Sequence, residues 1–140
     1  MSVRFEELAI GQELPVTARV VTREDVEAYA RASGDLNPLH REEEVARAAG
    51  YPGIVAHGML TMGTLTSALV GWLGDPEALT RLKVQFRSPV FLGERLESGG
   101  SVRSLDPQTR TAILEVWVRL ERDGRTEWPI RRSEAEIRLA

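Results

Sequence analysis

The residues best suited to chemistry lie in one short segment, ASGDLNPLH, which spans residues 32–40. It contains Asp35, His40 and the only asparagine of the chain, Asn37. A positioned carboxylate or imidazole is the usual means by which a protein moves a proton near neutral pH. The same residues also have an ordinary structural interpretation, in which Asp35 forms an Asx turn, Asn37 caps a helix and His40 is an incidental surface residue. Taken alone, the segment leaves both interpretations open.

The spacing of the carboxylate and the imidazole predicts a turn that leads into a helix. Asp35 and His40 are five residues apart with Pro38 between them, so they cannot share one face of a regular helix. We expect Asn37 to be the N-cap, Pro38 the first helical residue and His40 part of the first turn. Residues 41–49 continue as a short helix, which the breakers at 50–53 end.

A second candidate lies at His57 and Gly58, where an apolar stretch begins. The N–H of Gly58, at the positive end of a helix, could hold a developing oxyanion. Alternatively, Gly58 only allows a tight turn into the helix, and His57 caps or packs. A metal site formed by Asp35, His40 and His57 must also be weighed. Their irregular spacing matches no zinc signature, so we expect no metal.

The elements that must position these residues follow from the hydrophobic pattern. A strand over 15–22 precedes a helix over 23–33, for which Thr22 and Asp25 resemble a capping box and Gly34 is the stop. The stretch 58–73 carries no charge, so we expect a helix buried on all sides. At about 24 Å, with internal threonines and glycines, this helix is a poor candidate for a membrane span.

From residue 79 onward the hydrophobic period changes to two. Four stretches alternate apolar and charged residues, which predicts an antiparallel sheet with one covered face. With the earlier strand, this pattern predicts an α+β fold in which a curved sheet wraps one helix. The expected strands cover 81–90, 94–105, 111–124 and 127–140.

The bulk properties exclude several classes of function. A chain of 140 residues predicts one domain over 1–140, and a net charge of −3 gives no reason to expect nucleic acid as a partner. The chain has no cysteine, which excludes disulfides and thiolate chemistry. The N-terminal MSVRFEEL lacks the positive and apolar regions of a signal peptide. We therefore expect a cytoplasmic protein.

The stretch YARASGDLNPLHREEEVARAAGYPGIVAHGML resembles the signature of the MaoC-like (R)-specific enoyl-CoA hydratases, the hydratase 2 type. In that family a G-D-x-N-P-[LIV]-H turn is followed by a block that ends in HGM. The stretch LKVQFRSPVFLGERL is similar to the family's strand, Pro-Val turn and glycine, so the resemblance covers nearly the whole chain. It implies a hotdog fold, in which an antiparallel sheet wraps a long helix and two copies normally pair sheet to sheet.

The resemblance also implies roles for individual residues. Asp35 and His40 would be the catalytic pair, and the N–H of Gly58 would polarise the thioester carbonyl. Asn37 would support the site, and we include His57 among the candidate substrate-binding residues. Thr66, the third of these candidates, stands where some relatives have a serine near the substrate.

The implied activity is hydration of trans-2-enoyl-CoA, or the reverse dehydration of (R)-3-hydroxyacyl thioesters, with no cofactor. The thioester carrier is either CoA or acyl carrier protein. One alternative is a hotdog thioesterase, but such enzymes commonly use a carboxylate of the central helix, and residues 58–74 contain none. Another is a non-catalytic acyl-binding subunit, which usually lacks the Asp and His kept here. An exposed sheet edge predicts a homodimer or a dimer of dimers.

Overall fold

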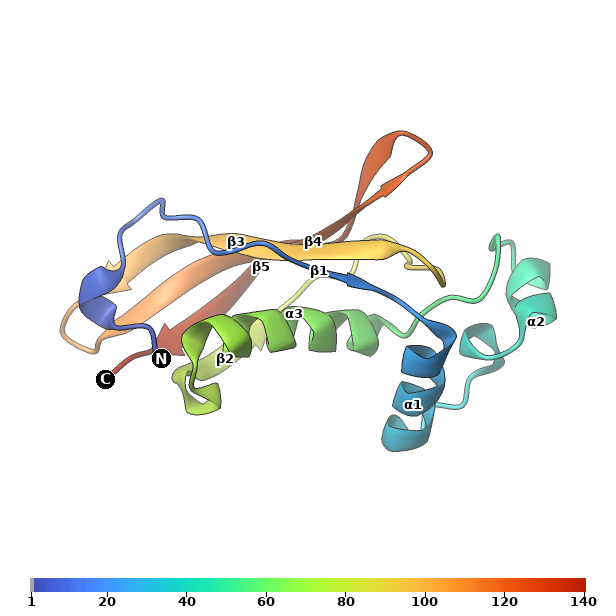
Figure 1. Ribbon diagram of the computed structural model, residues 1–140, viewed down its shortest axis with the longest axis horizontal. Helices are drawn as coiled ribbons and strands as arrows, with labels where there is room; N and C mark the ends of the chain where they lie inside the picture. Colours follow the sequence, from blue (N-terminus) through green and yellow to red (C-terminus); the bar gives the residue numbers. More distant parts are fainter. Residues whose placement is uncertain (1) are drawn as a thin grey trace.

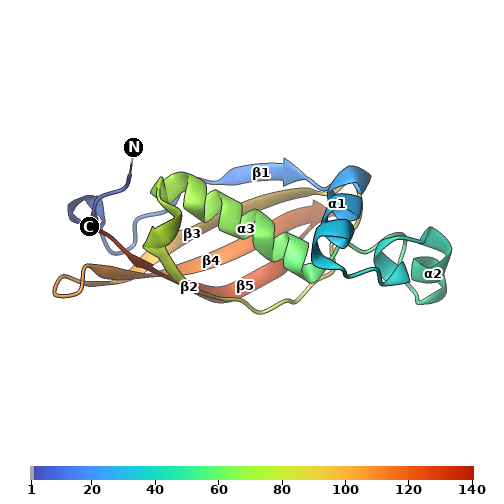
Figure 2. The same cartoon turned by 90° about the horizontal axis from the view of Figure 1, so that it is seen from below.

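The computed structural model describes residues 2–140, which build a curved antiparallel sheet around one long helix. The sheet has five strands in the order β1-β3-β4-β5-β2. Helix α3 lies across its inner face, and the two shorter helices lie beyond one end of the sheet (Figures 1 and 2). The elements are β1 (Thr17–Val20), α1 (Arg23–Ser33), α2 (Glu43–Ala48), α3 (Gly58–Leu73), β2 (Leu79–Lys83), β3 (Arg95–Asp106), β4 (Thr111–Arg122) and β5 (Arg125–Arg138).

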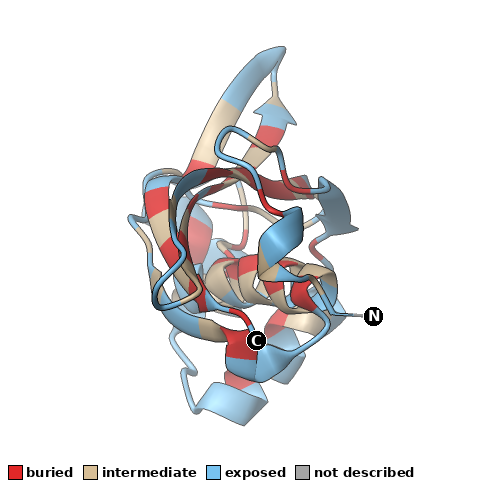
Figure 3. Ribbon diagram, turned by 90° about the vertical axis from the view of Figure 1, so that its left-hand side faces the viewer, coloured by how far each residue is buried: buried red, intermediate tan, exposed pale blue. Residues whose placement is uncertain are grey.

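The predicted alternation of the sheet is confirmed most clearly in β4. Leu114, Val116 and Val118 are fully buried, whereas the residues between them are partly or fully exposed. The buried side chains belong to the same apolar core as Leu65 and Leu69 of α3. In Figure 3 the buried residues, coloured red, occur on both the sheet and the helix. Burying each such side chain stabilises the fold by about 1.5–3 kcal/mol. The interface between the sheet and α3 is therefore the core of the protein.

The prediction that helix α3 is buried on all sides is wrong. One stripe of side chains, at every fourth position, is buried against the sheet, and the positions around it are partly or fully exposed. A groove of about 430 Å³ runs between the exposed side of α3 and strand β1. Small residues such as Gly63, Ser67 and Gly71 expose little apolar surface, so an uncharged helix face tolerates water here. Among residues 2–140, no helix has the length and apolarity needed to cross a membrane.

The strand predicted over 81–90 is too long, because β2 ends at Lys83. Beyond it, Phe86 makes only an isolated bridge to Ile130, and Pro89 has no N–H to donate to a ladder. The carbonyl of Val90 instead accepts a 2.8 Å hydrogen bond from the N–H of Ala56. The segment 84–90 therefore lies against the residues that lead into α3. The first strand is also shorter than predicted, whereas the strands expected after residue 90 are confirmed.

Helix α1 begins and ends as predicted. The side chains of Thr22 and Asp25 each accept a hydrogen bond from the other residue's backbone N–H, which forms the capping box. Gly34 ends the helix with a φ of 77°, a left-handed conformation that favours glycine. The chain then turns sharply, so Asp35 leaves α1 toward the beginning of α3.

Candidate active site

The turn after α1 is held by two short polar side chains. Asp35 Oδ1 accepts a 3.2 Å hydrogen bond from the N–H of Asn37, which forms an Asx turn. Asn37 Oδ1 in turn accepts a 3.0 Å hydrogen bond from the N–H of Leu39 and caps a single 3₁₀ turn, Pro38–His40. The predicted cap is confirmed, but the helix does not continue into α2. Glu42 has an extended backbone, which separates the two helical segments.

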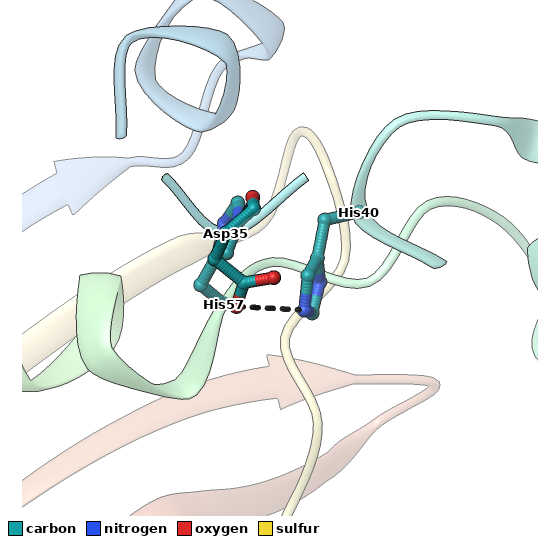
Figure 4. A group of neighbouring side chains, drawn as sticks. All are labelled: Asp35, His40 and His57. Atoms are coloured by element: carbon teal, nitrogen blue, oxygen red, sulfur yellow. Dashed lines mark hydrogen bonds and ion pairs between the residues drawn. The ribbon is translucent and has the colours of Figure 1, made fainter. Parts of the chain in front are cut away.

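One ring nitrogen of His40 faces Asp35, and the other contacts a backbone carbonyl. Its Nδ1 lies 2.6 Å from the carbonyl oxygen of Val55. Because a carbonyl oxygen only accepts, Nδ1 carries a hydrogen, and in the neutral ring Nε2 is then the nitrogen with the lone pair. Nε2 lies 3.9 Å from Asp35 Oδ2, and the two groups face each other (Figure 4). This separation is too long for a direct hydrogen bond but leaves room for a bridging water.

His57 is buried behind this pair and is the N-cap residue of α3. Its side chain makes no capping bond; instead its Nε2 donates a 3.1 Å hydrogen bond to the backbone carbonyl of Asp35. Its ring stacks on that of His40 with the centroids 3.9 Å apart. The centroid of the Tyr29 ring lies 4.8 Å from that of His57. Burial lowers the pKa of His57, and the hydrogen bond to Asp35 only partly opposes this effect. His57 is thus a neutral support under both members of the pair.

Gly58 is the first residue of α3, so its N–H has no acceptor within the helix. The ring of Phe86 covers it closely, since a Cβ built on Gly58 would lie 3.4 Å from Phe86 Cε1. The free N–H and the positive end of the helix dipole together favour an oxygen that carries negative charge.

His40 and Gly58 line one pocket of about 370 Å³. Its walls are mostly apolar, and Arg87 is its only residue with a permanent charge. A larger hollow of about 540 Å³ lies near the β3–β4 hairpin, but no histidine lines it. The remaining residues around the smaller pocket are Leu39, Tyr51, Val55, Ala56, Thr61, Phe86, Ser88, Pro89, Val90 and Pro129.

The structure brings together some of the residues singled out in the sequence and leaves others apart. Asp35 faces His40, which shares the pocket with Gly58. Asn37 shapes the turn, and its side chain is not part of the pocket wall. The hydroxyl of Thr66 donates a 2.8 Å hydrogen bond to the carbonyl of Met62, and Thr66 also lies outside the pocket wall.

Sequence reasoning missed Thr61, the one threonine of α3 that lines the pocket. Composition does not distinguish it from Thr64 and Thr66. The available signal was spacing, because residues three apart share a helix face. Thr61 is three residues after Gly58, and so it follows the candidate oxyanion donor on the same side of the helix.

Asp35, His40 and His57 also form the cluster in which a metal was considered. Their nearest ligand atoms all lie within 4.8 Å of one another. The stacked imidazole rings are inclined by only 29°, and ring nitrogens bind metals in the plane of the ring. Two nearly parallel planes do not direct both lone pairs at one ion at about 2.0–2.1 Å. The geometry therefore disfavours a metal, and its absence stays a prediction.

A curved antiparallel sheet wrapped around a central helix is the hotdog fold, and here a carboxylate and an imidazole lie close together near the beginning of that helix. The family profile described as "MaoC like domain" matches residues 5–118. The chain belongs to the MaoC-like dehydratase family, as the two sequence blocks predicted.

Individual relatives agree with this assignment. The chain is 32% identical to the 3-hydroxybutyryl-CoA dehydratase of Methylorubrum extorquens, over 79% of this chain and 70% of that protein. It is 29% identical to the (R)-specific enoyl-CoA hydratase of Rhodospirillum rubrum, over 76% of this chain and 74% of that one.

Other comparisons show how far the likeness extends. The mitochondrial 3-hydroxyacyl-[acyl-carrier-protein] dehydratase of Arabidopsis thaliana is 36% identical, and the match covers 64% of this chain and 52% of that protein. The structure of the (R)-hydratase from A. caviae involved in PHA biosynthesis superposes with a TM-score of 0.85. It is 23% identical, and the superposition covers 96% of this chain and 99% of that one. At that identity, the superposition supports the fold alone.

Proposed function

We propose that the protein adds water with (R) stereochemistry to trans-2-enoyl thioesters, or removes it from (R)-3-hydroxyacyl thioesters. Asp35 and His40 are the acid–base pair of this proposal. As a member of the MaoC-like dehydratase family, the protein is a hydro-lyase of the enoyl-CoA hydratase and 3-hydroxyacyl dehydratase type. The names of its relatives support both CoA and acyl carrier protein as carriers of the acyl group.

The observation that carries the proposal is the 3.9 Å gap between Asp35 Oδ2 and His40 Nε2. With the carboxylate ionised and the imidazole neutral, both atoms are hydrogen-bond acceptors, because the single ring hydrogen is on Nδ1. A water in the gap donates one hydrogen to each, which leaves its lone pairs directed away from both groups. This water is both activated and oriented for attack on a carbon in the pocket.

The proton balance of the reaction fits such a pair. As the water oxygen bonds to Cβ, the double-bond electrons move toward Cα and the carbonyl oxygen. The pair takes one proton from the water and delivers one proton to Cα, so Asp35 and His40 return to their starting state. Dehydration follows the same steps in reverse.

Gly58 supplies the remaining requirement, which is stabilisation of the enolate oxygen. Its N–H has no helical acceptor and lies at the positive end of α3. A fixed donor of this kind stabilises negative charge more strongly in an apolar pocket than the same donor does in water. The proposed thioester therefore lies with its carbonyl at Gly58 and its Cβ at the water.

Incubation with crotonyl-CoA tests the proposal directly. Loss of absorbance from the conjugated double bond reports hydration, and chiral chromatography of the product after hydrolysis should give the (R) enantiomer. Release of free thiol without hydration would instead indicate a thioesterase. A protein that is inactive alone but becomes active with a co-purifying homologue would be a non-catalytic subunit.

A further inference from the structure

Helix α3 contains three threonines, and the hydroxyl of one of them differs from the others. Thr64 and Thr66 each donate a hydrogen bond to the carbonyl four residues earlier, at 3.1 and 2.8 Å. Thr61 makes no such bond and has no side-chain partner within residues 2–140, although it is only 3% exposed. The hydroxyl is not among the fully buried side-chain atoms without a partner in residues 2–140, so its oxygen is accessible from the pocket that Thr61 lines. The hydroxyl of Thr61 is therefore available to a molecule that enters the pocket.

The pocket determines where that partner lies. Thr61 lines the same pocket as His40 and Gly58. Side chains on a helix lean toward its N-terminus, so the side chain of Thr61 extends back toward the turn that begins with Gly58. The hydroxyl of Thr61 and the N–H of Gly58 thus lie on one side of the helix.

We propose that the Thr61 hydroxyl is a second hydrogen-bond donor to the thioester carbonyl, beside the N–H of Gly58. The inference rests on the proposed hydratase function and names a further residue for it. Thr61 keeps its proton throughout, so no proton transfer is added to the reaction. Its hydrogen bond strengthens as the carbonyl oxygen gains negative charge, which places its effect mainly on the transition state.

The alternative partner, the attacking water, fits less well. That water already donates to Asp35 and His40, which lie on the turn after α1 and on the 3₁₀ turn that follows. Thr61 belongs instead to the helix that presents Gly58. Two donors on one helix face suit one oxygen acceptor, and this is the role of the carbonyl.

The kinetic test compares Thr61→Val, Thr61→Ser and Thr64→Val. Thr61→Val keeps the shape of the side chain and removes the donor, so kcat should fall by about 10- to 100-fold, while KM changes much less. Thr61→Ser should restore most of kcat because it retains the hydroxyl. Thr64→Val is the matched control, since its hydroxyl is already bonded within the helix, and its kcat should match that of wild type.

The stability of the same variants separates a substrate contact from a structural role. Removing a hydroxyl that makes no hydrogen bond to the protein should leave Tm unchanged or raise it. If Thr61→Val lowers Tm and kcat together, and Thr61→Ser restores both, the hydroxyl supports the fold and the inference is overturned. Should Thr61→Val not fold, Thr61→Ala offers a second removal of the donor for the same comparison.

A spectroscopic readout reports the carbonyl contact itself. Butyryl-CoA labelled with ¹³C at its carbonyl is saturated and cannot be hydrated. On binding to wild type, its carbonyl stretch should shift to lower frequency, less so with Thr61→Val and fully again with Thr61→Ser. An equal shift in wild type and Thr61→Val overturns the inference, as does an unchanged kcat in that variant. If wild type hydrates no enoyl thioester at all, the proposed function itself fails.

Discussion

The imidazole rings of His40 and His57 are stacked, with centroids 3.9 Å apart and planes inclined by 29°. The two residues have opposite surroundings, because His40 borders the pocket whereas His57 is only 2% exposed. His57 also donates a hydrogen bond to the carbonyl of Asp35. One buried ring therefore supports both proposed acid–base groups, and it connects the turn after α1 to the start of α3.

The acid–base pair gives the most direct prediction. Asp35→Asn and His40→Ala should each lower kcat by about 10²- to 10⁴-fold, which is the usual contribution of a positioned acid or base. Asn at position 35 keeps the oxygen that accepts from Asn37, so the turn should persist. The loss of crotonyl-CoA absorbance measures the rate, and an unchanged far-UV circular dichroism spectrum confirms the fold.

The matched control for Asp35→Asn is Glu44→Gln, which changes an exposed carboxylate of α2 in the same way. Its turnover should equal that of wild type. Near-wild-type turnover in Asp35→Asn or His40→Ala would remove that residue from the mechanism and with it the bridging water.

Much of this arrangement follows from local sequence, and its limits are physical. The ends of α1 depend on hydrogen bonds and dihedral angles within a few residues of Thr22, Asp25 and Gly34. The roles of these residues could therefore be predicted from the sequence. The Asx turn of Asp35 and the cap of Asn37 are equally local. The structural and the chemical interpretation of this segment are compatible, because the same turn that Asp35 helps to form also orients its carboxylate.

The features that sequence reasoning missed depend on contacts between distant segments. Charge alone could not show which sides of α3 face the sheet. The strand after α3 was predicted to reach Val90, but its last residues instead contact the segment before Gly58. Likewise, the sequence alone does not distinguish Thr61 from Thr66, because what separates them is that Thr61 borders the pocket together with Phe86, from a distant segment.

Burial of His57 makes a prediction about stability and pH. Because burial holds the pKa of His57 below its ordinary 6.5, the unfolded chain binds a proton more readily than the folded one. The free energy of unfolding should therefore fall as the pH drops below about 6.5 and level off once the pH has passed the folded-state pKa. Urea unfolding on both sides of pH 6.5 measures this effect.

Two variants isolate the contribution of His57. His57→Gln retains a donor for the Asp35 carbonyl but does not titrate, so its stability should depend less on pH than that of wild type. His40→Gln should keep the dependence that belongs to His57. If wild type and His57→Gln respond identically to acid, the buried ring is not the source of the effect.

The sheet edges lead to the prediction of an oligomer. Strand β1 pairs only with β3, and β2 pairs only with β5, so each edge strand has one unpaired side within residues 2–140. All four residues of β1 are exposed. Exposed edges favour pairing with another chain, which would bury their free N–H and C=O groups. Light scattering at micromolar concentration should give at least twice the 15.6 kDa mass of the chain, and a monomeric mass would contradict the prediction.

Gly58→Ala tests whether the thioester carbonyl reaches the helix N-terminus. The added methyl would lie 3.4 Å from Cε1 of Phe86, inside the wall of the pocket. Phe86 is 50% exposed and can shift, so the fold should tolerate the change, whereas the methyl obstructs access to the N–H. We expect a kcat at least about 10-fold lower, toward the loss seen when an oxyanion donor is removed.

Gly63→Ala is the control, because a Cβ there would meet no atom within 4 Å. It should keep full activity and raise the free energy of unfolding by about 1 kcal/mol, the gain expected when alanine replaces glycine inside a helix. If only Gly58→Ala loses activity, the cause is the methyl group beside the Gly58 N–H and not a general stiffening of the helix by alanine. If Gly58→Ala retained wild-type kcat, the carbonyl would have to bind elsewhere, and the role inferred for Thr61 beside it would fail as well.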